Sequence, residues 1–427
     1  MDAASLYKSL DEPDKADHLW RYTPWRRVHP SGDLNEIPIA ASPKITLSCL
    51  DDSVALVGIS VEEGVVGAEV LPESDEVTAS FIRAAAKESV YTLRVEKNFI
   101  ANSPIVLDID TGDSNCAIHL TLDIGRNCEF ELITQISGAA PWTGFLRTGR
   151  IGDGSILNDV VIGHTDSGVL LRVDSIAIGR DAQVKAGTVS SGSARTKADL
   201  RYKMGETGGH LNVLGSILSA SDMHLDHHIE IHHDAPETFS RLDWHSACGG
   251  NSRTVGTGML RVAKGARGAD AGQLFHNLLL SEKAEADAIP ELEVSEHDVV
   301  GCGHGTANGP VDEDQMFYLE SRGFDTEEAR DALIAAFLNS TLVEMGSDAL
   351  HNWLAEHLQD ELDDLKSSEI NLALAPFTSI MDHDHCSAIL CECGFRGAAI
   401  PMRQHMECPR CRRVVEAFCE GVPDYSQ

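Results

Sequence analysis

Two soft ligands lie close together at Cys302 and His304, and glycines flank both in the run Gly301-Cys302-Gly303-His304-Gly305. A thiol and an imidazole suit the binding of zinc or iron, and glycine lets the backbone approach a bound group closely. Short Cys/His pairs are also common where they have only a structural role. The residues alone therefore leave two interpretations open, a ligand pair or a glycine-rich turn.

Further metal-ligand residues lie near the C-terminus, where the last cysteines of the chain occur at short spacings from Cys386 onward. A short segment has little core of its own and gains most of its stability from a bound metal. Residues 382–427 therefore predict a zinc-ribbon-like module with structural zinc, while iron binding and thiol redox chemistry remain alternatives. The expected zinc ligands are Cys391, Cys393, Cys408 and Cys411, with Cys386 or Cys419 as alternatives.

A third group is a histidine cluster in residues 224–233, interleaved with aspartate and glutamate. Ile229 and Ile231 alternate with polar residues, which predicts a strand with its apolar side chains inward and its polar side chains outward. The polar row has two interpretations, a metal site or a face turned to solvent or a partner. The histidines concerned are His224, His227, His228, His232 and His233.

Charge and composition limit the partners of the chain. Its 427 residues carry a formal net charge of −33, so we expect neither nucleic acid nor an anionic membrane surface as a partner. The sequence has no apolar run of about 18 residues, and residues 1–15 do not resemble a secretory signal. Its 11 cysteines are an odd number, which favours a reducing compartment. We therefore expect a cytoplasmic protein.

A repeat organises the middle of the chain and must position these ligands. An apolar-Gly-charged step recurs at Gly125, Gly152, Gly179 and Gly205, at spacings of 27, 27 and 26 residues, with looser echoes later. The intervening runs alternate apolar and polar residues without a helical period, which favours a stacked parallel β-helix. We predict a mainly β protein with this core at residues 104–310, after an α/β segment at residues 1–103.

Flanking segments show helical and core-packing patterns. The run Trp20-Arg21-Tyr22-Thr23-Pro24-Trp25 is interpreted as core packing, and residues 77–89 as a helix. Downstream, Asp312 with Gln315 and Asp325 with Glu328 are capping pairs that predict two helix starts. A third helix is expected at residues 347–367, so residues 311–370 form a predicted helical region.

Several ordered motifs resemble the SufB/SufD family of iron–sulfur cluster assembly scaffolds. Upstream motifs extend the likeness to Asp226-His227-His228 and the N-terminal Trp20 motif, so that it covers about residues 15–346 and leaves the tail outside. The motifs that carry it are Leu278-Leu279-Leu280-Ser281, Pro290-Glu291-Leu292-Glu293-Val294, Cys302-Gly303-His304-Gly305, Asp312-Glu313-Asp314-Gln315 and Phe317-Tyr318-Leu319-Glu320-Ser321-Arg322-Gly323.

The resemblance implies a right-handed parallel β-helix between an N-terminal segment and C-terminal helices. It also implies pairing through the β-helix with a SufB-like protein and docking of a SufC-type ATPase on the helical region, residues 311–370. Ala284 stands where SufB-type chains carry a sulfur-accepting cysteine, and Gly303 and Gly305 stand where they carry carboxylates. The resemblance therefore points to the SufD-like subtype. It makes His304 the first candidate ligand of a transient iron–sulfur cluster shared with the partner, and Cys302 the second.

The expected function is that of a non-catalytic scaffold that builds iron–sulfur clusters and passes them to client apoproteins. The sequence has no G-x-x-x-x-G-K-[ST] phosphate loop, so ATP hydrolysis is expected in a partner. One alternative is an enzyme on a β-helix, either an acyltransferase or a histidine-metal hydratase. Rungs near 27 residues weigh against the six-residue period of hexapeptide acyltransferases. A specialised regulatory paralogue of the scaffold is the other alternative.

Overall fold

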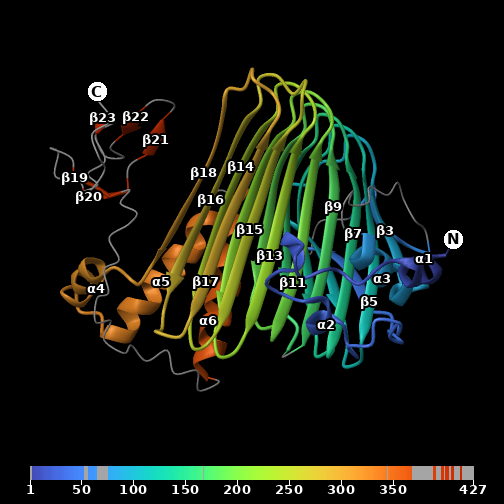
Figure 1. Ribbon diagram of the computed structural model, residues 1–427, viewed down its shortest axis with the longest axis horizontal. Helices are drawn as coiled ribbons and strands as arrows, with labels where there is room; N and C mark the ends of the chain where they lie inside the picture. Colours follow the sequence, from blue (N-terminus) through green and yellow to red (C-terminus); the bar gives the residue numbers. More distant parts are fainter. Residues whose placement is uncertain are drawn as a thin grey trace. The chain divides into compact units, whose positions relative to one another are not determined.

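Two compact units make up the chain, Met1–Ala375 and Pro376–Gln427. The computed structural model describes residues 2–51, 56–64, 76–166, 168–343 and 345–367, and the backbone of short strands between residues 388 and 415. The first unit is built on two nine-stranded sheets, named here the even sheet and the odd sheet. Successive strands alternate between them, so the chain winds into a β-solenoid of about 8 turns (Figure 1). The predicted parallel β-helix is confirmed.

The even sheet pairs its strands in parallel except for β1, which is antiparallel to β4. In spatial order its strands are β1 (Lys44–Cys49), β4 (Ile105–Asp110), β6 (Glu129–Ser137), β8 (Ile156–Gly163), β10 (Gln183–Ser190), β12 (His210–Ser219), β14 (Phe239–Cys248), β16 (Asp270–Leu279) and β18 (Gly301–Gly309).

The odd sheet is likewise parallel except for β2, which is antiparallel to β3. Its strands are β2 (Ile59–Glu63), β3 (Val90–Val95), β5 (Cys116–Ile124), β7 (Trp142–Ile151), β9 (Val169–Ile178), β11 (Arg195–Met204), β13 (His224–His233), β15 (Arg253–Val262) and β17 (Glu285–Val294).

Strand register explains the glycine repeat. Paired residues on successive strands from β5 to β17 are 27, 27, 26, 29, 29 and 32 positions apart. The regular glycine spacing thus marks the early rungs, and the later echoes are looser because the rungs lengthen. Close stacking accounts for glycine at these steps. A Cβ on Gly152 would lie 2.4 Å from the carbonyl oxygen of Gly125.

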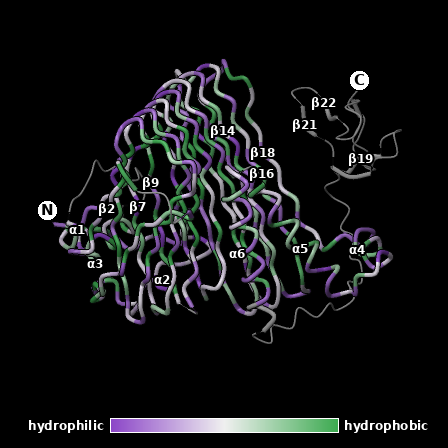
Figure 2. Tube along the Cα trace, turned by 180° about the vertical axis from the view of Figure 1, so that it is seen from behind, coloured by the Kyte–Doolittle hydropathy of each residue, from purple (hydrophilic) through white to green (hydrophobic). Residues whose placement is uncertain are grey.

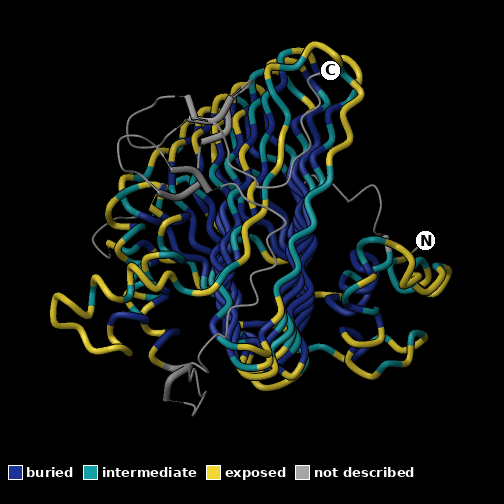
Figure 3. The backbone as a smooth tube through the Cα atoms, turned by 60° about the vertical axis from the view of Figure 1, so that its left-hand side comes forward, coloured by how far each residue is buried: buried dark blue, intermediate teal, exposed yellow. Residues whose placement is uncertain are grey.

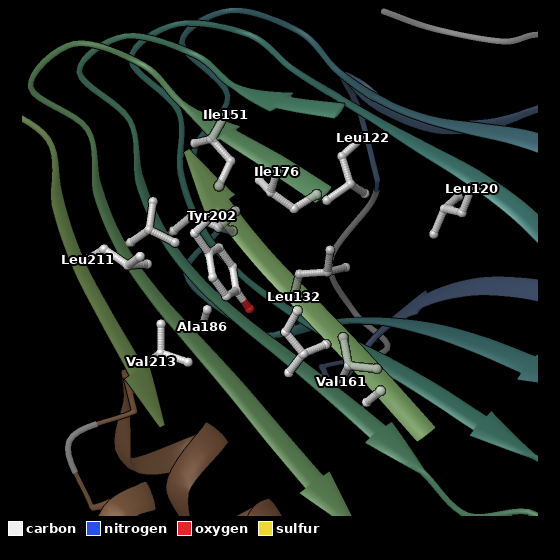
Figure 4. Close-up of a cluster of buried hydrophobic side chains, with 14 of the residues drawn as sticks. Leu120, Leu122, Leu132, Ile151, Val161, Ile176, Ala186, Tyr202, Leu211 and Val213 are labelled. Carbon is white, nitrogen blue, oxygen red and sulfur yellow. The ribbon is translucent and has the colours of Figure 1, made fainter. Parts of the chain in front are cut away.

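Alternate side chains of each strand point between the two sheets. Hydrophobic and hydrophilic residues alternate along many of the strands (Figure 2), and the buried residues concentrate in the stacked strands while the turns are exposed (Figure 3). Leu120, Leu132, Val161 and Tyr202 belong to the interior cluster, which draws on both sheets (Figure 4). Each rung therefore buries its apolar residues against the next, as expected for a solenoid.

A buried group of charges interrupts this apolar interior, which the repeat pattern did not predict. Arg147 on β7 lies 2.6 Å from Asp174 on β9, and it reaches across to Asp159 of the even sheet at 2.9 Å. Arg172 adds a second cation 2.7 Å from Asp174. Burial alone would raise the pKa of Asp174, but the two guanidinium groups hold that pKa below its usual value. Opposite charges thus balance one another inside the solenoid.

The N-terminal segment packs on the outer face of the odd sheet. Its helices are α1 (Ala3–Ser9), the 3-10 helix η1 (His18–Trp20), α2 (Trp25–Val28) and α3 (Glu76–Ala86). Trp20 and Trp25 are 4% and 1% exposed, and they share a core with Trp142 of β7. Core packing by the Trp20 motif is therefore confirmed. The helix expected at residues 77–89 forms as α3 and ends at Ala86.

Three helices of the described chain follow the solenoid, and the last two of them cover the outer face of the even sheet. The three are α4 (Glu313–Glu320), α5 (Thr326–Leu342) and α6 (Asp348–Ser367). Asp312 caps α4, and Asp325 with Glu328 forms the full capping box that begins α5. The apolar stripes of α5 and α6 pack with outward residues of the even sheet in one cluster. By contrast α4 buries none of its residues.

An ion pair links α6 to the solenoid and makes this contact sensitive to pH. His164 Nδ1 lies 2.9 Å from Glu361, and this hydrogen bond, opposed by burial, raises the pKa of His164 to about 9. A histidine whose pKa rises on folding stabilises the folded state fully below its unfolded pKa, about 6.5. That stabilisation is lost as the pH rises through about 9.

We therefore expect His164→Gln to lower the free energy of unfolding at pH 6.5 and to have little effect at pH 10. Chemical denaturation of both proteins across this range measures the difference. A deficit that stays constant from pH 6.5 to pH 10 would contradict the assignment.

The second unit contains short antiparallel strands. They are β19 (Ala388–Leu390) paired with β20 (Arg396–Ala398), and a sheet of β21 (Ile400–Met402), β22 (His405–Glu407) and β23 (Val414–Val415).

Candidate functional site at the open end of the solenoid

The predicted ligands Cys302 and His304 lie on β18, the last strand of the even sheet. Among the described strands β18 pairs with β16 alone, and β17 is the matching end strand of the odd sheet. The glycine-rich turn that the residues left open is therefore wrong, because this run is an extended edge strand in the terminal rung.

Register fixes the direction of the two side chains. Cys302 is paired with Ala271 and His304 with Gln273, while Ala271 and Phe275 belong to the interior cluster. Side chains two positions apart share a face of a strand, so Cys302 and His304 both lie on the inward face, about 6.6 Å apart along β18. The last rung thus directs a thiol and an imidazole toward the inner side of the solenoid, at the end that no further rung of the described chain covers.

Burial distinguishes the two ligands. Cys302 is half-buried and packs against the interior cluster and the smaller cluster around Val262, whereas His304 is exposed. Burial and then the nearby Asp270 carboxylate raise the pKa of the Cys302 thiol. A raised pKa keeps the thiol protonated until a metal cation displaces the proton. His304 is therefore the more accessible of the two side chains, and the Cys302 thiol would have to lose its proton to bind a metal.

The surrounding glycines leave β18 without side chains at the positions next to Cys302 and His304. A Cβ on Gly305 would lie 2.9 Å from Leu274 Cδ2, and a Cβ on Gly303 would meet nothing within 4 Å. Glycine in a strand often marks a place where another backbone or a ligand approaches closely. The space beside Gly303 is open to such a group.

Apolar residues of the same rung remain exposed. On β17, Leu292 and Val294 continue the inward rows of Leu260 and Val262, yet they are 36% and 42% exposed. In a solenoid these positions are covered by the next rung or by a cap. The described part of the chain supplies no such cover, so the end around Cys302 and His304 has the apolar character of an interface.

The histidine cluster lies on β13 and faces two ways. His227 and His233 point inward, and burial lowers their pKa values to about 3 and about 4, so both are neutral. His224 contacts Thr23 of the N-terminal segment at 2.8 Å. The expected outward polar row is confirmed, and little of it meets solvent, because the segment around Thr23 covers part of it and ion pairs fill the remainder.

Glu230 is the centre of that outward row. It pairs with Arg201 and His232, and His228 lies 3.6 Å away. Burial alone would raise the pKa of Glu230, but the hydrogen bonds from His228 and His232 hold it below its usual value. In the described ranges the one compact group of three metal-ligand residues is Asp243, His245 and His276, which sequence reasoning missed. The outward row on β13 is thus part of a network of ion pairs.

Comparisons with known proteins agree with this architecture. Residues 109–337, more than half of the chain, match the family model of the SufBD core domain of SUF system FeS cluster assembly. The chain belongs to the SufBD family.

Relatives of this SufBD protein carry the same family name. An iron–sulfur cluster assembly SufBD family protein of Mycobacterium leprae is 25% identical over 83% of this chain and 91% of its own length. A SufBD family protein of Mycobacterium tuberculosis is 25% identical over 84% of this chain and 92% of its own. The chloroplastic protein ABCI7 of Arabidopsis thaliana is 32% identical over 39% of this chain and 37% of its own.

Thiols elsewhere in this SufBD protein are less accessible. Within the described ranges Cys49, Cys116, Cys128 and Cys248 are buried, and Cys302 alone is partly exposed. Ala284, which is 9% exposed, carries no thiol. In these ranges, therefore, Cys302 carries the most accessible thiol.

The predicted zinc ligands of this SufBD protein lie outside the described residues. In sequence, however, Cys391 and Cys393 fall between the paired strands β19 and β20, and Cys408 and Cys411 fall between β22 and β23. Cys386 and Cys419 also lie outside the description, so the ligand set stays a prediction.

No helix in the described ranges of this SufBD protein has the length and apolarity needed to cross a bilayer.

Proposed function

We propose that this SufBD protein is a SufD-like scaffold subunit that holds part of an iron–sulfur cluster assembly site. The observation that carries the proposal is the inward placement of Cys302 and His304 at an uncovered, apolar rung. A site formed at the end of a solenoid becomes enclosed only when a second protein covers that end. The resemblance of the chain to SufB/SufD scaffolds makes a SufB-like protein the expected cover.

The chemistry of the cargo requires such sharing. Each iron of an iron–sulfur cluster is bound by protein thiolates or imidazoles in addition to its sulfides. Cys302 and His304 supply two such ligands, which leaves positions for ligands from the partner. The cluster is then a transient substrate of the complex, held at the subunit interface until a client apoprotein takes it.

The subtype assignment rests on what stands at three positions. Ala284 supplies no sulfur acceptor, and Gly303 and Gly305 supply no carboxylate beside His304. A subunit with these residues is able to ligate a cluster but not to receive sulfur at that position. Mobilisation of sulfur is therefore assigned to the SufB-like partner, and this chain acts as a non-catalytic scaffold.

The ATPase partner is proposed to dock on the helical region, residues 311–370. Phe317 and Tyr318 of α4 are 72% and 55% exposed, and Phe324 after it is 44% exposed. Solvent-exposed aromatic side chains that lie close together are typical of a protein–protein interface. The chain has no phosphate loop of its own, so a SufC-type subunit would hydrolyse the ATP.

The tail is proposed to bind structural zinc through the cysteine pairs that lie between its paired strands. A reducing compartment, as in the cytoplasm, would keep those thiolates free for metal and Cys302 free for the cluster.

Co-expression tests the assembly directly. The tagged chain, produced with a SufB-like protein and a SufC-type ATPase, is expected to purify as a stable complex that contains all three. If the purified chain retains neither partner at micromolar concentration, the proposed function is wrong. If the chain purifies with the ATPase but without the SufB-like protein, the docking of the ATPase stands and the pairing at the open end of the solenoid is wrong.

A further inference from the structure

A compact group of three metal-ligand residues lies on the outer face of the even sheet, away from the inward ligands Cys302 and His304. Asp243 and His245 lie on β14, and His276 is the register partner of His245 on β16. Their ligand atoms all lie within 4.8 Å of one another, and the two imidazole rings are 4.9 Å apart. The stacking of two rungs thus brings together residues that are 31 positions apart in the sequence.

Helix α5 fixes the orientation of His245. Its Nδ1 lies 2.8 Å from the carbonyl oxygen of Phe337, and its ring stacks on Phe337 at 4.4 Å. A carbonyl oxygen only accepts hydrogen bonds, so Nδ1 carries the proton that it donates. In the neutral imidazole the lone pair is then on Nε2. Histidines that bind metals commonly use this arrangement, donating one ring N–H to a backbone carbonyl and binding the metal with the other nitrogen.

Nε2 of His245 faces an acceptor. Asp243 Oδ1 lies 3.2 Å from it, and this buried oxygen has no hydrogen-bond partner. A buried carboxylate oxygen that accepts no hydrogen bond beside an imidazole lone pair is unfavourable unless a cation neutralises it. That cation is either a proton on Nε2, which makes a histidine–aspartate ion pair, or a metal ion. The imidazole of His276 beside the pair favours the metal, because a second neutral nitrogen adds a ligand.

We propose that Asp243, His245 and His276 form a binding site for a divalent transition metal, Fe²⁺ or Zn²⁺. Two imidazoles and one carboxylate suit these metals and leave coordination positions for water or a further ligand. The side chain of Asp243 is 39% exposed, which gives solvent ions access, while that of His245 is 9% exposed and anchored to α5. Half-buried His276 supplies the third ligand atom.

Metal at this site would join α5 to the sheet. His245 connects the metal to the Phe337 carbonyl, and Asp243 and His276 connect it to two rungs. The site does not depend on the proposed scaffold function, because it lies on the opposite face of the sheet from the cluster ligands.

Cobalt provides the probe, because it replaces both metals and reports its ligands by absorption. The metal-free full chain is dialysed against Co²⁺ under anaerobic conditions, and bound cobalt is counted by elemental analysis. Thiolate ligands of the tail give intense charge-transfer bands, whereas imidazole and carboxylate ligands give only weak visible bands. Asp243→Asn and His276→Gln are each expected to lose one bound equivalent and to keep the thiolate bands unchanged.

His210→Gln is the matched control, because it removes an exposed imidazole from β12 and should retain every equivalent. A circular dichroism melt shows whether each variant is folded. Because two different ligands are substituted, the test remains valid if one of the variants does not fold. Equal cobalt content in the parent and in both folded variants would overturn the proposal. The same titration with Fe²⁺ and Zn²⁺ then ranks the two natural candidates by affinity.

Discussion

Replacing Arg147 with leucine is expected to lower the free energy of unfolding by about 3–5 kcal/mol, the usual effect of removing one member of a buried ion pair. The arginine is 1% exposed, and it bonds Asp174 and Asp159, which are 0% and 3% exposed. Without it, one cation, Arg172, remains beside these two buried carboxylates. An unpaired negative charge that water cannot reach is costly, so the folded state would lose much of its stability.

Arg150→Leu is the matched control, because it removes an arginine from the same strand. Its side chain is 40% exposed, and its partners Asp153 and Glu206 are also accessible to water. Exposed ion pairs contribute about 0–1 kcal/mol, so this variant should unfold almost like the parent. Guanidinium denaturation of the three proteins measures both differences. Equal stability of the Arg147 and Arg150 variants would show that the interior charges are solvated.

The second large effect is expected at the open end, where Leu292→Arg should weaken binding of the SufB-like partner by at least about 30-fold. This corresponds to about 2 kcal/mol, the level at which an interface residue counts as a hot spot. Leu292 is 36% exposed on β17, in the inward row that a covering protein would contact. A guanidinium there would have to be buried without a counter-charge.

Ile39→Arg is the control for that substitution. Ile39 is an aliphatic residue that is 88% exposed, and nearby Ala41 bridges Cys116 of β5, which lies far from β17 in the odd sheet. Titration calorimetry with the purified SufB-like partner should give the parental affinity for Ile39→Arg and a much weaker one for Leu292→Arg. If both variants bind like the parent, the partner does not cover this end.

Local spacing was enough to predict the solenoid and its capped helices. Stacked rungs need glycine where backbones nearly touch, as at Gly152, and this steric need leaves a repeat in the sequence. The capping of α5 by Asp325 and Glu328 is likewise complete within one turn of helix. Features that depend on neighbouring residues are the ones that a single sequence reveals.

Features that depend on rung stacking could not be read in this way. The interior ions at Arg147, Asp159 and Asp174 are separated by at least 12 positions, and the alternation rule alone assigns no partner to an inward charge. For the polar row on β13 the residues left a metal site and a face turned to solvent or a partner open, since the sequence does not tell that Thr23 folds back onto it from 201 residues away.

The candidate site was partly predictable. The types of Cys302 and His304 and their likeness to a family motif identified them, but their inward direction and the exposed rung around them follow from the register of β18 on β16. His245 and His276 gave no signal at all, since neither lies in a short motif and only the stacking of β14 and β16 joins them.

The most direct test of the central claim is anaerobic reconstitution of the chain with its SufB-like and SufC-type partners, followed by counting iron and acid-labile sulfide per complex. The parent should assemble with both partners and hold a cluster. The variant His304→Ala should assemble equally well and hold much less iron and sulfide, because the complex forms but one inward ligand is missing. An unchanged cluster content in His304→Ala, or the absence of any complex with the parent, would contradict the account.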